Sequence, residues 1–582
     1  PELWDAYSDV APPYVRRRDR LEVDERTDYN GQILQPLNEE SGRNVARILR
    51  SRNVESVAVT LVNAYMNGAN EKRMKEVIQQ ECPDVFVCTS HEILPEIFEH
   101  ERTSTTVVNA CLGPVVSRYL LDLRKRLTEA GYKGDVLVLH SGGGVMTAET
   151  ISYYAARIAN SGPTAGAMAG SFFAKLTGFE NSIGMDMGGT STDVSLMYKG
   201  NMRQTKEWWV EFGYPIMFPS IETVSIGAGG GSIAWIDEGG SLRNGPQSTG
   251  AQPGPACYMK GGKDPTNTDA NLVLGRLNPS MFLGGDMKVS NEAAELAIKT
   301  RIADPLKLKI TEASNAILQV ANSNMCDAVR LISIRRGYDP REFVLVVFGG
   351  AGPVHGVAIA KELEISKVVV PPWPGITSAM GCLLVDIKHD LTTTSIMNAD
   401  KADPKNIEES FLSMEDEART RLSTEKVTKK RMKLQRYMDM RYIGQWRSLT
   451  VPCEKPLGKS LSRIVAKFHA EHSREYAYSR EDQGVEIYGL RVTAMGAVDR
   501  PKLRAYRKKG AIAPRPESKR KVYFEEERGF VTTPIYLRNK LPVNTHIRGP
   551  AVVEQLDSTV LIPPRVSAEV DPYLNIIMNL KK

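Results

Sequence analysis

Cysteine is scarce in this sequence, with seven residues in 582, at positions 82, 88, 111, 257, 326, 382 and 453. An odd number of cysteines in a long chain, with no C-x-x-C pair, argues against a disulfide-stapled secreted domain and against a structural zinc site. We therefore expect the reducing environment of the cytoplasm. Long hydrophobic runs are also absent, because no apolar stretch reaches the roughly 18 residues that a membrane span requires. The N-terminal run PELWDAYSDV does not resemble a signal peptide, so we expect a soluble protein with no membrane partner.

A large excess of charge is missing as well. Lys and Arg number 75 against 69 Asp and Glu, a formal net charge of +6. Part of this surplus lies in residues 502–521, directly before three glutamates at 525–527, which is typical of a solvated surface loop. A nucleic-acid partner is therefore not expected. Hydrophobic residues make up 42% and charged residues 25%, as in ordinary globular proteins, and the length allows three or four domains of about 150 residues.

The pattern of apolar residues changes along the chain. Residues 40–160 alternate between helical and strand patterns, which predicts a parallel sheet. Residues 160–280 are rich in glycine, and the alternation returns in residues 306–395. Residues 400–432 are charged and helical, as expected of a connector or an exposed helix. Residues 433–582 predict a mainly β region with one helix.

Three glycine-containing segments carry the strongest functional signal. RIANSGPTAGAMAGSFFA (157–174) predicts a helix whose small residues allow close packing against a neighbouring helix. GMDMGGTSTDVSLM (184–197) predicts a strand, a Gly-Gly-Thr turn and a returning strand. VLVVFGGAGPVHGVAIAKEL (344–363) predicts a buried strand, a Gly-Gly turn and a helix. Each motif alone is a weak match, but their order and spacing together are specific.

The chemistry of the second segment suits a nucleoside triphosphate. Backbone N–H groups of Gly188, Gly189 and Thr190 could approach phosphate oxygens with no Cβ in the way, and Thr190 and Thr192 add hydroxyl donors. Asp186, at the end of the first strand, could hold magnesium or orient an attacking oxygen. The alternative is a tight turn that simply needs glycine.

Two further glycine clusters extend the candidate site. Gly349 and Gly350 would let an adenosine lie against the chain, and the following helix N-terminus favours anions. The block 225–240 is either a loop over phosphates or a flexible hairpin. The candidate cofactor-binding residues are therefore Gly188, Gly189, Thr190, Thr192, Gly229, Gly230, Gly349, Gly350, Ala351 and His355; Asp186 and Asp193 are the candidate catalytic residues, and Asp186 is the candidate metal ligand.

The first two segments resemble the linker-helix and second-phosphate segments of the actin, hexokinase and heat-shock chaperone ATPase superfamily, and FGGAGP resembles its adenosine segment. SGPTAGAMAG, DMGGTSTDVSL, RRGYDPREFVLVVFGGAGPVHG and RGPAVVEQLDSTVLIPP look like the hydantoinase A and 5-oxoprolinase family, which includes a subunit of acetone and acetophenone carboxylases. The resemblance spans about residues 9–580.

The resemblance implies an α/β fold with actin-like (ribonuclease H-like) ATPase domains and a mainly β C-terminal region. Residues 1–155 would be the remainder of an N-terminal actin-like domain. Residues 156–400 would be the second, nucleotide-binding one with a glycine-rich insertion at about 205–300, and residues 401–582 the C-terminal domain. It further implies ATP with Mg²⁺ or Mn²⁺, a small carbonyl substrate, and a hydantoinase B-like companion subunit, with small accessory subunits as further candidates.

The family reaction moves the ATP γ-phosphoryl group to a carbonyl-derived oxygen. Our first hypothesis is a subunit of a ketone carboxylase that phosphorylates an enol oxygen, with bicarbonate as a further acceptor, because Trp208, Trp209 and Trp373 lie close to the glycine segments and could wall an aromatic ketone. The alternative is an ATP-dependent hydantoinase or 5-oxoprolinase subunit that hydrolyses a cyclic amide; the tryptophans would then be core residues.

One family feature is missing from these residues. Members carry another strand and Gly-Gly-Thr turn, of the kind GxDxGGTFTD, near their start, and residues 1–155 contain none. In the family that loop supplies a second metal-side carboxylate, so phosphoryl transfer depends on it. A third hypothesis therefore stays open, a subunit that binds nucleotide only as a scaffold.

Overall fold

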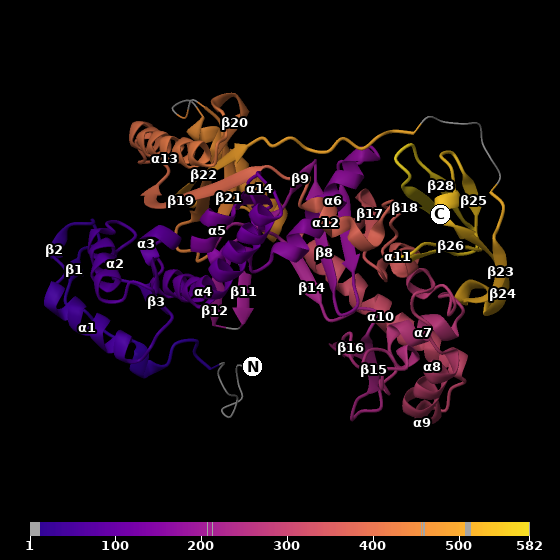
Figure 1. Ribbon diagram of the computed structural model, residues 1–582. Helices are drawn as coiled ribbons and strands as arrows, with labels where there is room; N and C mark the ends of the chain where they lie inside the picture. Colours follow the sequence, from indigo (N-terminus) through magenta and orange to yellow (C-terminus); the bar gives the residue numbers. More distant parts are fainter. Residues whose placement is uncertain are drawn as a thin grey trace. The chain divides into compact units, whose positions relative to one another are not determined.

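The computed structural model describes residues 12–206, 208–211, 213–455, 457, 460–506 and 514–580. The chain divides into two compact units that interleave along the sequence (Figure 1). The first unit comprises Pro1–Ser161, Gln204–Ile221 and Val385–Asp499. The second unit comprises Gly162–Arg203, Glu222–Leu384 and Arg500–Lys582. The three-domain division at 155 and 400 stays a prediction.

A nine-stranded mixed sheet forms the centre of the second unit. Its strand order is β14-β8-β7-β17-β18-β29-β28-β25, with β9 added beside β8. β17 runs parallel to β7 and β18, and the other neighbours are antiparallel. The strands are β7 (Ser182–Met187), β8 (Thr192–Tyr198), β9 (Asn201–Met202), β14 (Thr223–Ile226), β17 (Val344–Phe348), β18 (Lys367–Val370), β25 (His546–Arg548), β28 (Val566–Val570) and β29 (Ile576–Leu580).

Helices cover this sheet because its central strands are apolar on both faces. All five residues of β17 are buried, as expected for a parallel strand between two layers. Leu345 and Val347 pack with buried residues of α10 (Ile310–Ile332) and α11 (Gly352–Glu362). Val344, Val346 and Phe348 instead pack with Phe173 of α6 (Ser161–Leu176).

The small residues of α6 face the sheet. A Cβ at Gly170 would lie 3.2 Å from the ring of Phe348, so a larger residue there would force the helix away from β17. The sequence predicted close packing of this helix against another helix, and the structure shows that its glycines pack against a strand residue.

Smaller elements surround the central sheet of the second unit. A hairpin of β15 and β16 precedes α7 and α8, and a four-stranded sheet of order β23-β24-β26-β27 lies near the C-terminus. The bounds are β15 (Ser232–Ile236), β16 (Leu242–Ser248), α7 (Asn267–Val273), α8 (Asn291–Ile298), α9 (Asp304–Leu306), α12 (Thr377–Gly381), β23 (Ser518–Phe524), β24 (Gly529–Leu537), β26 (Ala551–Glu554) and β27 (Thr559–Ile562).

The first unit contains a six-stranded sheet of order β21-β20-β22-β19-β6-β5. β6 and β19 are its only parallel pair among the described strands. α13 buries one face, including Phe411, against β22, so the expectation of a connector or exposed helix there is wrong. Its apolar residues recur at helical spacing among many charges. The bounds are β5 (Leu137–His140), β6 (Gly144–Thr147), β19 (Ile387–Asn398), α13 (Pro404–Thr424), β20 (Met432–Tyr442), β21 (Leu449–Cys453), α14 (Leu461–Tyr476) and β22 (Val485–Gly496).

The N-terminal part of the first unit combines short strands with helices. β3 and β4 pair in parallel as the alternating pattern predicts, but the prediction of one parallel sheet over residues 40–160 is wrong because β5 turns back antiparallel to β6. The bounds are β1 (Arg26–Thr27), β2 (Ile33–Gln35), α1 (Glu39–Ser51), β3 (Ser56–Val59), α2 (Ala69–Glu81), β4 (Phe86–Thr89), α3 (Ser90–Ile93), α4 (Glu99–Glu129), α5 (Ala148–Tyr153), β10 (Gln204–Thr205), β11 (Trp208–Glu211), β12 (Tyr214–Ile216) and β13 (Ser220–Ile221).

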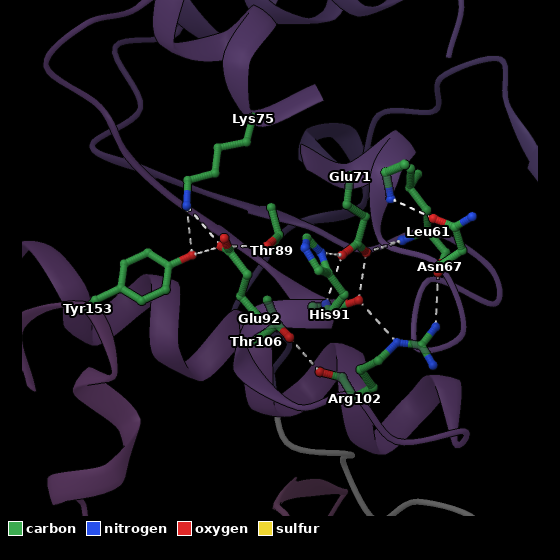
Figure 2. A network of polar contacts seen from close by, with 12 residues as sticks. Leu61, Asn67, Glu71, Lys75, Thr89, His91, Glu92, Arg102, Thr106 and Tyr153 are labelled. Carbon is green, nitrogen blue, oxygen red and sulfur yellow. Dashed lines mark hydrogen bonds and ion pairs between the residues drawn. The ribbon is translucent and has the colours of Figure 1, made fainter. Parts of the chain in front are cut away.

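Buried polar contacts join these N-terminal elements (Figure 2). The fully buried carboxylate of Glu71 accepts hydrogen bonds from the backbone N–H of Leu61 (2.7 Å) and of His91 (2.8 Å). Nearby, Lys75 contacts the Glu92 carboxylate at 2.9 Å. Burial raises the pKa of Glu92, but hydrogen bonds with Lys75, Tyr153 and Thr89 outweigh this effect and hold the pKa at about 2. The network ties α2 to the β4–α3 segment. Within the described residues, no helix is both long enough and apolar enough to cross a bilayer.

Candidate active site

The Gly-Gly-Thr turn joins β7 to β8 in the second unit, as the sequence predicts. The N–H of Gly188 donates to the carbonyl of Ser191 at 3.0 Å and closes the turn. Asp186 and Asp193 are direct partners in the antiparallel register. Opposite residues of such a pair project from the same face of the sheet, with Cβ atoms about 5 Å apart. The structure therefore places the two candidate catalytic carboxylates side by side.

Each of these carboxylates is held by one serine. The Ser378 hydroxyl in α12 donates to Asp186 Oδ2 at 2.5 Å, and the Ser225 hydroxyl in β14 donates to Asp193 Oδ1 at 2.5 Å. Burial raises the pKa of Asp186, and the negative charge of Asp193 raises it further, while the Ser378 hydrogen bond opposes both effects. Burial likewise raises the pKa of Asp193. Two partly desolvated carboxylates at a turn are poised to accept a cation.

The backbone of the turn leaves two N–H groups free. Gly189 and Thr190 are exposed, and their N–H groups make no hydrogen bond within the described residues. A Cβ built on Gly189 would meet nothing within 4 Å, and its φ is not left-handed. The folded chain itself therefore gives no reason for glycine at position 189, whereas a ligand that lies against the backbone would.

The glycine-rich block at 227–231 packs directly against this turn. The N–H of Gly230 donates to the carbonyl of Gly188 at 3.0 Å, and the N–H of Gly231 donates to the carbonyl of Gly189 at 2.6 Å. A Cβ on Gly229 would lie 2.5 Å from the backbone nitrogen of Thr190, so only glycine permits this approach.

This packing sets the direction of the two free N–H groups. In a trans peptide the C=O and the following N–H point in opposite directions. Because the carbonyls of Gly188 and Gly189 face the block, the N–H groups of Gly189 and Thr190 point away from it, on one side. Two such groups in succession form a concavity that favours an anion. Gly229 and Gly230 thus orient the turn through packing.

Two threonine hydroxyls also hold the glycine-rich block in place. The buried hydroxyl of Thr192 donates to the carbonyl of Ala228, so we propose that Thr192 holds the block, in place of a phosphate contact. The Thr268 hydroxyl donates to the carbonyl of Gly230 at 2.9 Å. Thr268 lies in the first turn of α7, which is capped by Thr266 with Asp269 completing the capping box.

The Gly-Gly turn between β17 and α11 meets the end of β7. Gly349 has a φ of +80°, and a Cβ there would lie 2.3 Å from the carbonyl of Met187, so position 349 requires glycine for the fold. The N–H of Ala351 donates to the same carbonyl at 3.1 Å. Gly350 is exposed, and the nearest atom to a Cβ there is the Asp557 carbonyl at 3.4 Å. Like Gly189, Gly350 has room for a ligand.

His355 lies inside the fold. Only 1% of the residue is exposed, and its Nδ1 and Nε2 face Asn322 (2.7 Å) and Asn271 (3.4 Å). Burial and the charge of Arg276 lower the pKa of His355 to about 3, so the ring is neutral. We therefore propose a packing role for His355, which links α11 to α7 and α10, in place of a nucleotide contact.

The three tryptophans differ in their surroundings. Trp208 belongs to the first unit and packs with Ile216 and Phe218. Trp209 is 50% exposed. Trp373 belongs to the second unit and lines a groove of about 1030 Å³. Trp208 therefore packs as a core residue, and an aromatic wall formed by the three side chains stays a prediction.

The donor set suits a divalent cation that is shared with phosphates. No group of three or more His, Cys, Asp or Glu side chains that could hold a metal occurs in the described part of the chain. Asp186 and Asp193 supply two carboxylates beside an anion-binding turn. Mg²⁺ is commonly held in this way, by one or two carboxylates together with water and substrate phosphates.

Comparison with known proteins assigns the chain. Models of the hydantoinase/oxoprolinase family match residues 102–391, its C-terminal domain matches 395–582, and its N-terminal region matches 1–82. The chain belongs to the hydantoinase/oxoprolinase family. The family predicted from the sequence is confirmed.

Relatives of this family member include caprolactamase subunit alpha of Pseudomonas jessenii, 34% identical over 98% of this chain and 82% of the relative. The acetophenone carboxylase gamma subunit of Aromatoleum aromaticum is 33% identical over 96% of this chain and 79% of the relative. An uncharacterized protein of Methanocaldococcus jannaschii is 40% identical over 98% of this chain and 84% of the relative.

Two solved structures share the fold. The ATP-dependent caprolactamase of Pseudomonas jessenii superposes with a TM-score of 0.90 at 32% identity, over 100% of this chain and 84% of that one. A nucleotide-free acetone carboxylase, solved to study ATP-dependent acetone carboxylation, superposes with a TM-score of 0.77 at 27% identity, over 98% and 82%. The predicted α/β fold of the actin-like ATPase type is confirmed. The family contains ATP-dependent enzymes, and several relatives are named as subunits.

Sequence reasoning missed Ser378 and Ser225. Ser378 lies in the run PPWPGITSAMG and Ser225 in TVSIGAGGG, both far from Asp186 in sequence. A hydroxyl on an isolated serine carries no pattern, so only the folded chain connects it to a carboxylate.

Proposed function

We propose that this chain transfers the γ-phosphoryl group of ATP to the carbonyl oxygen of a small cyclic amide, as one subunit of a larger enzyme. The observation that carries the proposal is the β7–β8 turn, with two free N–H groups on one side and the paired carboxylates of Asp186 and Asp193 in its two strands. These are among the parts that phosphoryl transfer needs, because the protein's task in that reaction is positioning and charge neutralisation.

Each part has a proposed role. The N–H groups of Gly189 and Thr190 hold phosphate oxygens, and Gly350 lies against the nucleoside. Asp186 and Asp193 hold Mg²⁺ (or Mn²⁺), which when bound neutralises phosphate charge. Ser378 fixes the orientation of Asp186 and keeps its carboxylate ionised at lower pH than burial alone would allow.

Phosphorylation suits the chemistry of an amide. Phosphorylation of the amide oxygen, with ADP as the leaving group, makes the amide carbon open to attack by water. The C–N bond of the resulting tetrahedral intermediate breaks as the nitrogen takes up a proton, and water then displaces phosphate from the acyl phosphate that is formed. The proposal favours a cyclic amide over our first hypothesis, the ketone carboxylase, for two reasons. Trp208 packs as a core residue, which weakens the tryptophan argument for an aromatic ketone, and the fold resembles the caprolactamase more closely than the acetone carboxylase.

The ketone carboxylase remains the second candidate. Support for it comes from the 33% identity to the acetophenone carboxylase gamma subunit. Both candidates place the later chemistry on a hydantoinase B-like companion subunit, with small accessory subunits as further candidates in a carboxylase.

A substrate screen separates the two candidates. The full-length protein, purified with its companion subunit, is assayed for ATP consumption with caprolactam, 5-oxoproline, hydantoin, acetone and acetophenone, each with and without bicarbonate. The proposal predicts stimulation by a cyclic amide that does not depend on bicarbonate. Bicarbonate-dependent consumption with a ketone would establish the carboxylase instead. ATP consumption that no carbonyl compound changes would contradict both.

A further inference from the structure

The six-stranded sheet of the first unit carries an unusual buried face. Lys388 and Asp390 of β19 and Arg491 of β22 are 7%, 3% and 3% exposed. In the antiparallel register Asp390 lies opposite Thr493, and Thr392 lies opposite Arg491, so these side chains share one face of the sheet. Arg157, from the segment after α5, is 7% exposed and interacts electrostatically with Asp390.

Several nitrogen atoms in this cluster have no hydrogen-bond partner among the described residues. These are Nε and Nη1 of Arg157 and Nε of Arg491, all of which are buried. Asp390 Oδ2 lies 3.2 Å from the Lys388 ammonium, but within the described part of the chain it too accepts no hydrogen bond. Buried donors are almost always satisfied in folded proteins, because an unmade hydrogen bond costs stability. Unpartnered donors on two arginines therefore point to something that binds between them.

Aromatic rings hold the two guanidinium groups in place. The guanidinium of Arg157 lies 4.3 Å from the ring centre of Phe218, and that of Arg491 lies 4.8 Å from the ring centre of Tyr437. Stacking on a ring fixes the plane of a guanidinium and leaves its N–H edge free for another contact. The edge of a guanidinium matches the two oxygens of a carboxylate.

The charge of the cluster favours a monoanion. Lys206 contacts Glu96 (2.8 Å) and Asp439 (2.9 Å) next to Arg491. Burial lowers the pKa of Lys388, and the nearby Asp390 carboxylate opposes this effect. With Lys388 protonated, the cluster of Arg157, Lys206, Arg491, Lys388, Glu96, Asp390 and Asp439 has four positive and three negative side chains, so that one positive charge is left over. His140 does not change this balance, because burial and the nearby positive charges lower its pKa to about 3.

We propose that the first unit holds a binding site for a small carboxylate-type monoanion, with Arg157 and Arg491 as its ligands. Two chemical sources fit. The carboxylate of an organic substrate agrees with the proposed reaction of a cyclic amide, and hydrogencarbonate agrees with the second candidate, the ketone carboxylase. The role of the anion as a substrate rests on the proposed function. The site itself does not, because anion binding requires no ATP.

The experiment measures binding to the full-length protein in the absence of ATP. Equilibrium dialysis uses ¹⁴C-labelled acetate in one arm and ¹⁴C-labelled hydrogencarbonate in the other, in a halide-free buffer of constant ionic strength. We expect saturable binding of one anion per chain. Preference for acetate would identify an organic carboxylate, and preference for hydrogencarbonate the one-carbon anion. Absence of saturable binding in both arms would mean that water fills the site and would overturn the proposal.

Matched variants locate the site. Arg157→Met and Arg491→Met should each weaken binding at least tenfold. Arg421→Met is the control: Arg421 also interacts with Tyr154 near Arg157, but it is paired with Glu417, so its loss should leave binding unchanged. Equal binding by wild type and both Met variants would refute the assignment.

Two further measurements guard against failed folding and against confusion with the nucleotide site. A bromide soak of wild-type crystals should give an anomalous peak between Arg157 and Arg491; its absence counts against the site. Asp186→Asn should bind the anion normally while phosphoryl transfer is lost. If wild type binds the anion normally but neither wild type nor any variant shows an ATP-dependent reaction, the proposed function is refuted and the anion site is not.

Discussion

The Asp186→Asn substitution tests the proposed active site most sharply. Asp186 projects beside Asp193 from β7 and is held by Ser378. The amide of asparagine keeps the size of the side chain but cannot supply charge to a cation. Loss of one such preorganised electrostatic contact typically costs about 3–4 kcal/mol of transition-state stabilisation. We therefore expect kcat to fall roughly 10²- to 10³-fold.

The same variant should be more stable than wild type at neutral pH, although its kcat is lower. Because burial raises the pKa of Asp186 above its ordinary value of 3.8, the folded state binds its proton more tightly than the unfolded state. Stability contributed by this residue is then lost as pH rises through the raised pKa. Replacement by asparagine should raise the Tm of the ligand-free protein at neutral pH. The gain should vanish below the ordinary pKa, where aspartate is protonated in both states.

The assay measures substrate-dependent ATP consumption in the presence of the companion subunit and Tm by circular dichroism. Asp286→Asn, an exposed carboxylate of the same unit, is the control and should change neither quantity. A folded Asp186→Asn protein with turnover close to wild type would refute the assignment of Asp186.

Three other predictions follow from the site. Ser378→Ala removes the hydrogen bond that lowers the pKa of Asp186, so the acid limb of the kcat/KM profile should move to higher pH; an unmoved limb would contradict this role. Gly350→Val should raise the Kd for ATP at least tenfold with little change in the Tm of the ligand-free protein. Gly349→Ala should lower that Tm, because φ of Gly349 is +80° and its Cβ would meet the backbone. The reverse pattern would mean that Gly350 is required by the fold and that Gly349 lies against the nucleotide. The chain without its companion subunit should bind ATP but yield no ring-opened product in a chromatographic assay, and full-rate product formation would place the whole reaction in this polypeptide.

Local patterns predicted the elements of the site. The β7–β8 hairpin and the β17–α11 turn follow from apolar runs interrupted by paired glycines, and both occur where the sequence placed them. The functions of individual glycines could not be separated in this way. Gly349 and Gly229 are required by close backbone contacts, which come from segments distant in sequence. A Cβ at Gly189 would meet no atom within 4 Å, and one at Gly350 would meet only the Asp557 carbonyl at 3.4 Å.

Local patterns could not predict what tertiary contacts decide. His355 follows an adenosine-like motif, but its ring turns into the core and meets two asparagines of other helices. Alternation of helices and strands suggested a parallel sheet, yet short turns such as the one between β5 and β6 return the chain antiparallel. The buried cluster around Arg157 and Arg491 left no mark in the sequence, because its seven charged members come from six segments that are far apart along the chain.

The fate of the substrate's carbonyl oxygen tests the central claim most directly. The cyclic amide that best stimulates ATP consumption is prepared with ¹⁸O in its carbonyl group and is turned over by the full-length protein with its companion subunit. If that oxygen receives the γ-phosphoryl group and the phosphate later departs with it, inorganic phosphate should gain one ¹⁸O atom for each ring opened, as measured by mass spectrometry. Unlabelled phosphate, with all of the ¹⁸O retained in the new carboxylate, would contradict the account.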